Sequence, residues 1–262
     1  MRALVRRVGP PLVFLLVVLG AWQLYASRSA ISSATLPAPT EVATALWDGR
    51  DALWSAGRVT LWEILLGYLT AVVLGVGLAV AISSSRLAER AVYPWLVVSQ
   101  MIPIVAIAPI IVIWTGFDLR PKVIVIALVS FFPIAVNTVD VLRSADPEQL
   151  DLLRTMGAGR WRRFRLAQWP AALPFVFSGL RVAAALAVIG AVFAEWVGAS
   201  DGLGYLILTY NNQTATADVF AAVAVLAVIG IALFAAVSIA ERLLLPWYHG
   251  ARRNELRVGG GV

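Results

Sequence analysis

The stretch "DPEQLDLLRTMGAGRWRRFRLAQWPAALP", Asp146–Pro174, is far more polar than the sequence on either side of it. Five arginines fall within twelve consecutive positions of this stretch, whereas the chain of 262 residues is 60% hydrophobic and only 14% charged. Soluble domains carry roughly 25% charged residues. The stretch is therefore a polar insertion in an apolar protein, and the apolar segments around it predict the fold class.

Six apolar runs flank this insertion, and each is close to the ~20 residues that a helix needs to cross a bilayer. They are Val8–Ala26, Thr60–Ser83, Val92–Trp114, Val123–Val141, Phe175–Val197 and Val219–Leu244. Helices satisfy their backbone polar groups within lipid, whereas a β-barrel would show alternating segments of about ten residues. We therefore expect an all-α, polytopic membrane protein with six transmembrane helices.

The basic residues predict which side of the membrane each loop faces. If the N-terminus is cytoplasmic, fifteen of the 21 Lys and Arg residues lie in cytoplasmic segments, and five, including Lys122, lie in outer loops. The cytoplasmic residues are Arg2, Arg6, Arg7, Arg86, Arg90, Arg143, Arg154, Arg160, Arg162, Arg163, Arg165, Arg242, Arg252, Arg253 and Arg257. Cytoplasmic loops carry an excess of Lys and Arg, so both ends of the chain are expected inside.

These runs divide the chain into an N-terminal region, a transmembrane domain and a tail. We expect residues 1–55 to hold an anchor helix and an extracellular loop, residues 56–250 to form the transmembrane domain, and residues 251–262 to form a cytoplasmic tail. We read the first run as an uncleaved anchor and not as a signal peptide, because no small-residue cleavage site follows it. The basic run Arg160–Arg165 is best read as a solvated face that sets topology, so no nucleic-acid partner is expected.

The residue types that the chain lacks exclude several kinds of site. It has no cysteine and a single histidine, His249, so one chain cannot build a histidine metal cluster or a Ser–His catalytic arrangement. The only lysine, Lys122, lies between Pro121 and Val123, so the chain has no G-x-x-x-x-G-K-[ST] phosphate loop. We expect no catalytic residue, no metal and no cofactor, and any ATP must be bound by another chain.

A few polar residues lie at or near membrane depth and are candidates for lining a substrate path: Glu195, Gln100, Asn137 and Asn211. An ionisable group within a membrane is a functional-site hypothesis, because its burial in lipid is costly. The alternative is that polar groups join one helix to another by hydrogen bonds. For Arg181 and Asp140 we favour pairing or snorkelling at the interface. Prolines such as Pro103 are expected to kink the third run, and Ser200–Asp218 is expected to be an outer hairpin or an ordinary loop.

The polar insertion begins with the signals of a short helix. Asp146 can accept hydrogen bonds from free backbone amides, and Pro147 suits a first helical turn. Gly157 and Gly159 are expected to end this helix of about ten residues. Its Leu and Met ridge would stay exposed without a partner. A second amphipathic piece, Trp161–Gln168, is expected to lie on the inner leaflet and to end before Pro170.

The segment "DLLRTMGAGRWRRFRLAQWPAALP" resembles the EAA loop of ATP-binding-cassette (ABC) importer permeases, E-A-A-x-x-x-G followed nine residues later by I-x-L-P. Asp151 stands at the glutamate position of that motif, Gly157 at its glycine and Pro170 at its terminal proline. The chain departs from the motif at four positions, where Leu152 and Leu153 replace the alanines and Ala167 and Trp169 replace Ile and Leu.

The following sequence, "ALPFVFSGLRVAAALAVIGAVFAEWVGASDGLGYLI", resembles the nitrate/sulfonate/taurine-type branch of these permeases, and the resemblance covers roughly residues 55–250. It implies a MetI-like fold in a bacterial inner membrane, with residues 146–170 as a coupling segment. It also implies three partners: an ATP-binding subunit dimer, a second permease copy and an extracytoplasmic substrate-binding protein. The coupling residues implied are Asp151, Leu152, Leu153, Met156, Gly157, Ala158 and Pro170.

The substrate is predicted only by further resemblance. The run from Gln100 to Pro147 looks most like permeases assigned to thiamine-pyrimidine precursors, with aliphatic sulfonate, taurine, nitrate and riboflavin-type substrates as alternatives. A secondary transporter would need intramembrane carboxylates within inverted repeats, and Glu195 alone qualifies. An intramembrane enzyme would need a nucleophile and base or metal ligands, which the composition disfavours.

Overall fold

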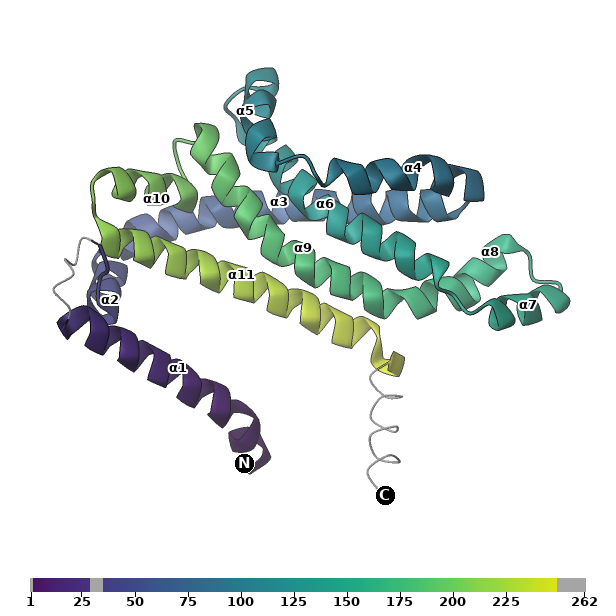
Figure 1. Ribbon diagram of the computed structural model, residues 1–262, viewed down its shortest axis with the longest axis horizontal. Coiled ribbons are helices and arrows are strands. Elements are labelled where there is room, and N and C mark those ends of the chain that lie inside the picture. Colours follow the sequence, from purple (N-terminus) through teal and green to yellow (C-terminus); the bar gives the residue numbers. More distant parts are fainter. Residues whose placement is uncertain (1, 29–34, 249–262) are drawn as a thin grey trace. The chain divides into compact units, whose positions relative to one another are not determined.

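The computed structural model describes residues 2–28 and 35–248 of the chain (Figure 1). Its helices are α1 (Arg2–Arg28), α2 (Pro39–Asp48), α3 (Arg50–Ser83), α4 (Arg86–Ser99), α5 (Ile104–Thr115), α6 (Leu119–Arg143), α7 (Pro147–Thr155), α8 (Arg160–Arg163), the π-helical turn η1 (Phe164–Gln168), α9 (Trp169–Gly198), α10 (Leu203–Asn212) and α11 (Thr216–Leu244). No strand occurs in these two ranges, so the all-α prediction is confirmed. The predicted tail, residues 251–262, and His249 lie outside the described residues, as do the side chains of residues 1–8.

Within the described residues, five helices are long and apolar enough to cross a membrane. They are Gly9–Arg28 of α1, α3, α6, the continuous helix Arg160–Gly198 and α11. α4 and α5 add a sixth span if the bent pair that they form is counted as one. The prediction of several transmembrane helices is therefore confirmed, and the third of them has an unexpected form.

The third predicted span, Val92–Trp114, is not one kinked helix. α4 and α5 meet at an angle of 98° across a short break. Pro103 stands at the N-cap of α5 in an extended conformation, with φ −65° and ψ 115°. A proline has no backbone N–H to donate, and it disfavours helical geometry at the residue before it. The chain therefore leaves the helix before Pro103 and starts a new helix after it.

The polar insertion also continues into the membrane helix without the stop expected at Pro170. The helix runs unbroken from Arg160 to Gly198, and η1 forms one π-helical turn just before the proline. The amide of Trp169 donates to the carbonyl oxygen of Phe164, five residues earlier. Because Pro170 cannot donate to the preceding turn, a local widening to π geometry accommodates it. The prediction that Pro170 ends a separate piece is wrong for this reason.

The contacts within the chain define two compact units, and each is described by itself. Unit 1 comprises the described parts of Met1–Thr60 and Ser200–Ala227. There the segment predicted as an outer hairpin or loop forms α10 instead, with Leu203 fully buried. The amide of Leu203 donates to the buried hydroxyl of Thr60 at 2.8 Å, which anchors the first turn of α10. Gly202 precedes that turn with φ +113°, a conformation that favours glycine.

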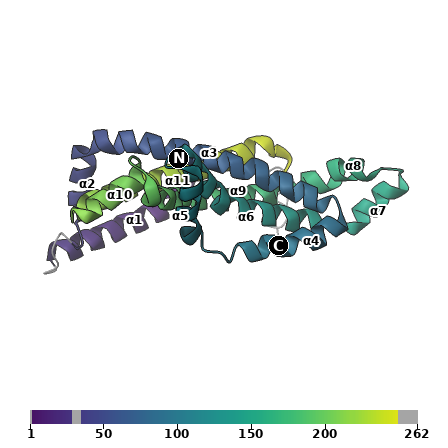
Figure 2. The ribbon, with the colours of Figure 1, turned by 90° about the horizontal axis from the view of Figure 1, so that it is seen from above.

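Unit 2 comprises Leu61–Ala199 and the described part of Val228–Val262. Its centre is the packing of α6 against α9, which lie side by side in both views of the molecule (Figures 1 and 2). Small residues on α9 permit this approach: Ala183, Ala184, Ala187 and Ala191 are fully buried. A side chain at Gly190 would meet the Cα atom of Ile126 at 3.2 Å. Small residues that let helix backbones approach closely are typical of membrane helix pairs.

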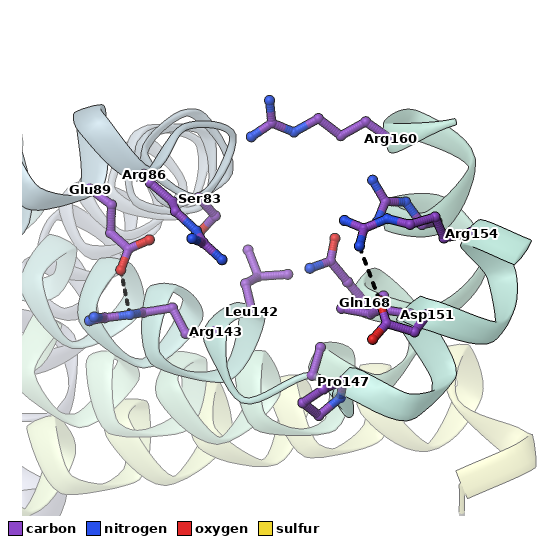
Figure 3. A pocket seen from close by; sticks show the side chains of 13 residues that line it. Ser83, Arg86, Glu89, Leu142, Arg143, Pro147, Asp151, Arg154, Arg160 and Gln168 are labelled. Atoms are coloured by element: carbon purple, nitrogen blue, oxygen red, sulfur yellow. Dashed lines mark hydrogen bonds and ion pairs between the residues drawn. The ribbon is translucent and has the colours of Figure 1, made fainter. Parts of the chain in front are cut away.

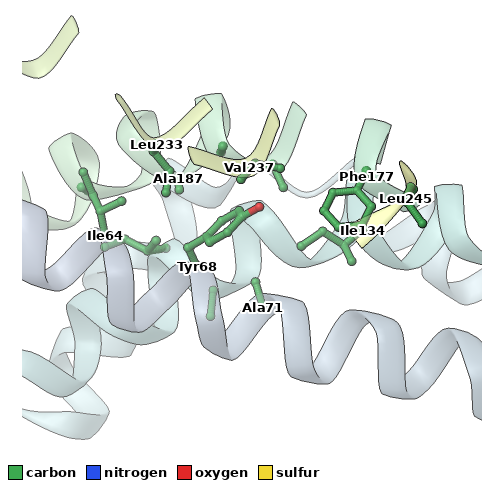
Figure 4. Packing of buried hydrophobic residues seen from close by; sticks show 14 residues of the cluster. Ile64, Tyr68, Ala71, Ile134, Phe177, Ala187, Leu233, Val237 and Leu245 are labelled. Atoms are coloured by element: carbon green, nitrogen blue, oxygen red, sulfur yellow. The ribbon is translucent and has the colours of Figure 1, made fainter. Parts of the chain in front are cut away.

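A larger apolar cluster surrounds this helix pair (Figure 4). It includes Ile64 and Tyr68 from α3, Ile134 from α6, and Leu233 and Val237 from α11. The hydroxyl of Tyr68 donates to the carbonyl oxygen of Leu180 at 2.9 Å, so the one polar atom of the ring is satisfied within the cluster. Within unit 2, α5 lies at one end of the packed helices and α7 and α8 lie at the other (Figure 1).

Candidate functional site

The first turn of α7 is fixed by the residues that predicted it. The carboxylate of Asp146 accepts a hydrogen bond from the amide of Glu148 at 2.9 Å, and Pro147 occupies the first helical position. A side-chain cap satisfies amides that have no carbonyl partner within the helix, and a proline there sacrifices no hydrogen bond. The predicted start of this helix is confirmed.

The last turn of α7 closes with a Schellman motif. The amide of Ala158 donates to the carbonyl oxygen of Leu153 at 2.9 Å, and the amide of Gly157 donates to that of Arg154 at 3.0 Å. Gly157 has φ +76°, the left-handed conformation that this motif requires and that glycine adopts without strain. The predicted end of the helix is confirmed at Gly157. Gly159 has φ −65° and precedes α8 instead.

α7 presents an exposed apolar ridge. Leu152 is 62% exposed and Met156 is 73% exposed, and no residue of the helix is buried. Asp151 and Arg154 are also exposed and form an ion pair at 3.2 Å on the helix surface. A nine-residue helix without buried side chains gains little from packing on its own chain. The two caps therefore stabilise a short helix whose apolar side chains are exposed to the surroundings of the chain.

Two cavities lie beside α7. The first is mainly apolar, has a volume of about 580 Å³, and brings together the predicted coupling residues Leu152, Leu153 and Pro170 with Trp247 and Tyr248 beyond α11. The second is polar, has a volume of about 640 Å³, and is lined in part by Asp151 (Figure 3). The predicted coupling residues therefore lie in α7, directly after it, or, for Pro170 of α9, in the lining of the cavity beside it.

A third cavity, of about 470 Å³, lies at the break between α4 and α5. It is lined by Ser99, Gln100, Ile102, Pro103, Ile104, Ile107, Leu128, Val129, Phe132, Pro133 and Leu186. Gln100 was predicted to line a substrate path, and it is the one predicted path residue that lines this cavity. The broken helix combines an apolar surface with an exposed amide and unwound backbone, which is a common arrangement at transporter binding sites.

The other predicted path residues do not gather around this cavity. Glu195 is only 1% exposed, inside unit 2. The side-chain amide of Asn137 donates to the carbonyl oxygen of Pro133 at 2.7 Å, one turn earlier on α6. Asn211 is exposed on α10, in unit 1. The path-lining role of these three residues stays a prediction.

The partners in the ion pairs between distant helices were not predicted from the sequence. Lys122, placed by the sequence in an outer loop, lies in the first turn of α6 and contacts Glu63 at 2.5 Å, with side chains 12% and 2% exposed. Arg181 pairs with Glu241 of α11. Asp140 accepts a hydrogen bond from the hydroxyl of Tyr93 at 2.8 Å. Arg181 and Asp140, which were each expected to pair or to snorkel, therefore each have a side-chain partner on another helix. No short-range pattern signals pairs that are about sixty residues apart.

The described residues form several apolar helices that are long enough to cross a membrane, and one bent helix pair. Bent or broken helices among membrane spans are typical of transport proteins. The chain belongs to the family described as binding-protein-dependent transport system inner membrane components, which matches residues 71–250. It is therefore a multi-pass membrane protein and the permease component of an ABC importer.

Individual relatives agree with this assignment. The chain is 40% identical to the formylaminopyrimidine transport permease protein ThiX of Halalkalibacterium halodurans, over 90% of this chain and 95% of that one. It is 37% identical to the riboflavin transport system permease protein RibX of Chloroflexus aurantiacus, over 90% of this chain and 88% of that one. A solved inward-facing MetNI methionine ABC transporter is similar in fold, with a TM-score of 0.58 and 20% identity over 76% of this chain and 96% of that one.

Proposed function

We propose that this permease forms the substrate path of a bacterial inner-membrane importer and is driven through α7 by a separate ATPase subunit. The observation that carries the proposal is the ridge of Leu152 and Met156 on a helix capped at both ends. Burying a large apolar side chain contributes about 1.5–3 kcal/mol, so a groove on a partner would stabilise docking of this ridge. The two caps maintain the helical form of α7, and its ends are joined by short connections to α6 and α8.

The proposed assembly contains two copies of this chain, two ATP-binding subunits and an extracytoplasmic substrate-binding protein. Two observations support this composition: one concerns ATP binding by a separate subunit, and the other concerns a second copy of the permease. The chain has no phosphate loop, because its only lysine follows Pro121 and pairs with Glu63. The cavity at the α4–α5 break is open on one chain and offers few polar groups, so a second copy is needed to enclose a substrate.

For the substrate we propose a small heteroaromatic solute of the thiamine-pyrimidine precursor type. The relative at 40% identity is a formylaminopyrimidine permease protein. The α4–α5 cavity supports the proposal, since the ring of Phe132 offers a stacking surface and the amide of Gln100 can donate to and accept from ring nitrogens. A riboflavin-type substrate is the second candidate, because a riboflavin permease protein is 37% identical. Aliphatic sulfonate, taurine and nitrate are the other candidate substrates to be tested.

The experiment is purification of tagged permease from its native membranes, followed by reconstitution with its binding protein in liposomes. We expect an ATPase subunit to co-purify, and uptake of radiolabelled formylaminopyrimidine to require ATP and to persist when ionophores collapse ion gradients. Riboflavin and taurine serve as competing solutes. Uptake that follows an ion gradient without ATP would contradict the proposal, and ATP-driven uptake of taurine alone would contradict only the choice of substrate.

A further inference from the structure

The polar cavity beside α7 is lined by several arginines, which suit the binding of an anion. We name it the arginine cavity and define it by its basic residues, Arg86, Arg143, Arg154, Arg160 and Arg163. In Figure 3 the guanidinium groups of Arg86, Arg154 and Arg160 point into the space between α4 and the α7–α8 segment. A volume of about 640 Å³ accommodates an anion together with several waters, since a water occupies about 30 Å³.

The charges of the arginine cavity are not balanced by the protein. It contains two carboxylates: Glu89 pairs with Arg143 at 2.6 Å, and Asp151 pairs with Arg154 at 3.2 Å. The other three arginines, Arg86, Arg160 and Arg163, have no carboxylate partner in the described part of the chain. Like charges that converge on one cavity repel each other, so the site favours an anion.

Two polar atoms of the lining point to a bound group independently of net charge. The hydroxyl oxygen of Ser83 and the Nε atom of Arg163 are buried, and neither has a hydrogen-bond partner among the described residues. Both residues line the arginine cavity. Buried polar atoms in proteins are nearly always hydrogen-bonded, to the protein or to a bound molecule. An anion with several acceptor oxygens can accept from several guanidinium groups and hydroxyls together.

The lining comes from segments that the positive-inside rule places in the cytoplasm. Ser83 ends α3, Arg86 begins α4, Arg143 ends α6, and Arg160 begins α8. On that side of the membrane, phosphate oxygens are carried by anionic phospholipid headgroups at the inner leaflet and by soluble phosphates. Arginine suits both, because its planar guanidinium group matches the geometry of phosphate.

We propose that the arginine cavity binds one phosphate group, held by Arg86 of α4 and by Arg160 and Arg163 of α8. A phosphate in this position bridges the start of α4 to the coupling segment. It therefore fixes α8 relative to α4. This binding is a property of the permease alone and does not require the docking of α7 on an ATPase.

The test uses the purified full-length permease in a non-ionic maltoside detergent, with two probes added separately: short-chain phosphatidylglycerol and inorganic phosphate. A short-chain diacylglycerol, which carries no phosphate, is the uncharged control. The variant Arg160→Gln/Arg163→Gln removes two cavity arginines, and the matched control Arg162→Gln/Arg165→Gln removes two arginines of the same segment that do not line the cavity. Binding is measured by native mass spectrometry and by calorimetry at low and high salt.

We expect saturable binding of one anion per chain, weakened at least tenfold (about 1.4 kcal/mol) in the cavity variant and less than twofold in the control variant. Binding of phosphatidylglycerol alone identifies a lipid site, and binding of phosphate alone identifies a soluble-anion site. Equal weakening in the two variants would mean that binding depends on the net charge of the segment and not on the cavity, and it would overturn the proposal. Absence of saturable binding of both probes by the unaltered chain would also overturn it.

A second measurement covers the case in which the cavity variant does not fold. The chain contains no cysteine, so Ala145→Cys places a single thiol in the lining of the cavity while every arginine is kept. We expect the bound probe to slow the reaction of this thiol with neutral iodoacetamide at least fivefold. A thiol at Phe117, which is exposed and outside the cavity, is the control and should react at an unchanged rate. Equal rates at position 145 with and without either probe would overturn the proposal.

Discussion

Replacing Gly157 with leucine tests how α7 works. Gly157 has φ +76° and supplies the left-handed residue of the Schellman motif at the end of α7. No atom lies within 4 Å of the position that a Cβ atom would take, so the substitution creates no clash in the permease itself. Its cost is therefore local to the backbone.

The size of that cost follows from the geometry. A residue with a side chain pays about 1–2 kcal/mol to hold the left-handed conformation. α7 has no buried residue to oppose unwinding, so the last turn can relax and release the strain. An energy of 1–2 kcal/mol shifts the equilibrium about 5- to 30-fold toward the unwound turn. In addition, the leucine side chain projects beside Met156, where a docking groove would meet it.

The assay measures uptake, membrane abundance and retention of the ATPase subunit in the same cells. For Gly157→Leu we expect normal abundance, weak retention of the ATPase and no uptake. Gly157→Asn, which tolerates the left-handed conformation better, should retain partial uptake. Gly159→Leu is the matched control, because Gly159 also has no neighbour within 4 Å but has an ordinary φ of −65°. Normal uptake by Gly157→Leu with full ATPase retention would show that transport does not depend on the capped end of α7.

Three further predictions concern other parts of the molecule. The chain purified without partners should not hydrolyse ATP, and ATPase activity that co-elutes with it in size-exclusion chromatography would contradict this. Lys122→Ala removes the ammonium group that contacts the buried carboxylate of Glu63 at 2.5 Å, and it should destabilise the permease by about 3–5 kcal/mol in thermal or denaturant unfolding. Arg120→Ala breaks the exposed pair with Asp118 and should cost less than about 1 kcal/mol. The intact complex should contain two permease chains by native mass spectrometry, and a mass with one copy would be inconsistent with the proposed path.

The sequence predicted the fold class and the presence of α7 because both depend on local signals. Apolar runs of about 20 residues are enough to predict membrane helices. The start of α7 depends on Asp146 and Pro147, and its end on Gly157, all within one short stretch. These residues act on their own backbone or on amides a few positions away, so no knowledge of the tertiary structure is needed.

Other features depend on residues that only the fold brings together. Pro103 predicted a kink, but the 98° angle between α4 and α5 depends on how each helix packs. The pairing of Lys122 with Glu63 joins positions 59 residues apart. The only lysine was predicted in an outer loop, and it lies in the first turn of α6 instead. At Pro170 the sequence favours a helix end, and the adjacent π-helical turn resolves the conflict without one. The cavity around Gln100 also requires α4, α5, α6 and α9 together.

Site-specific cross-linking can detect contact between α7 and a separate ATPase subunit. Since the chain has no cysteine, Leu152→Cys on α7 and Phe117→Cys between α5 and α6 each supply one thiol, at positions 62% and 75% exposed. In the purified, ATPase-containing complex, a short bifunctional reagent should join position 152 to the ATPase subunit and leave position 117 unlinked. Failure of position 152 to cross-link in an intact, transport-competent complex, or equal cross-linking from position 117, would show that α7 is not the docking element.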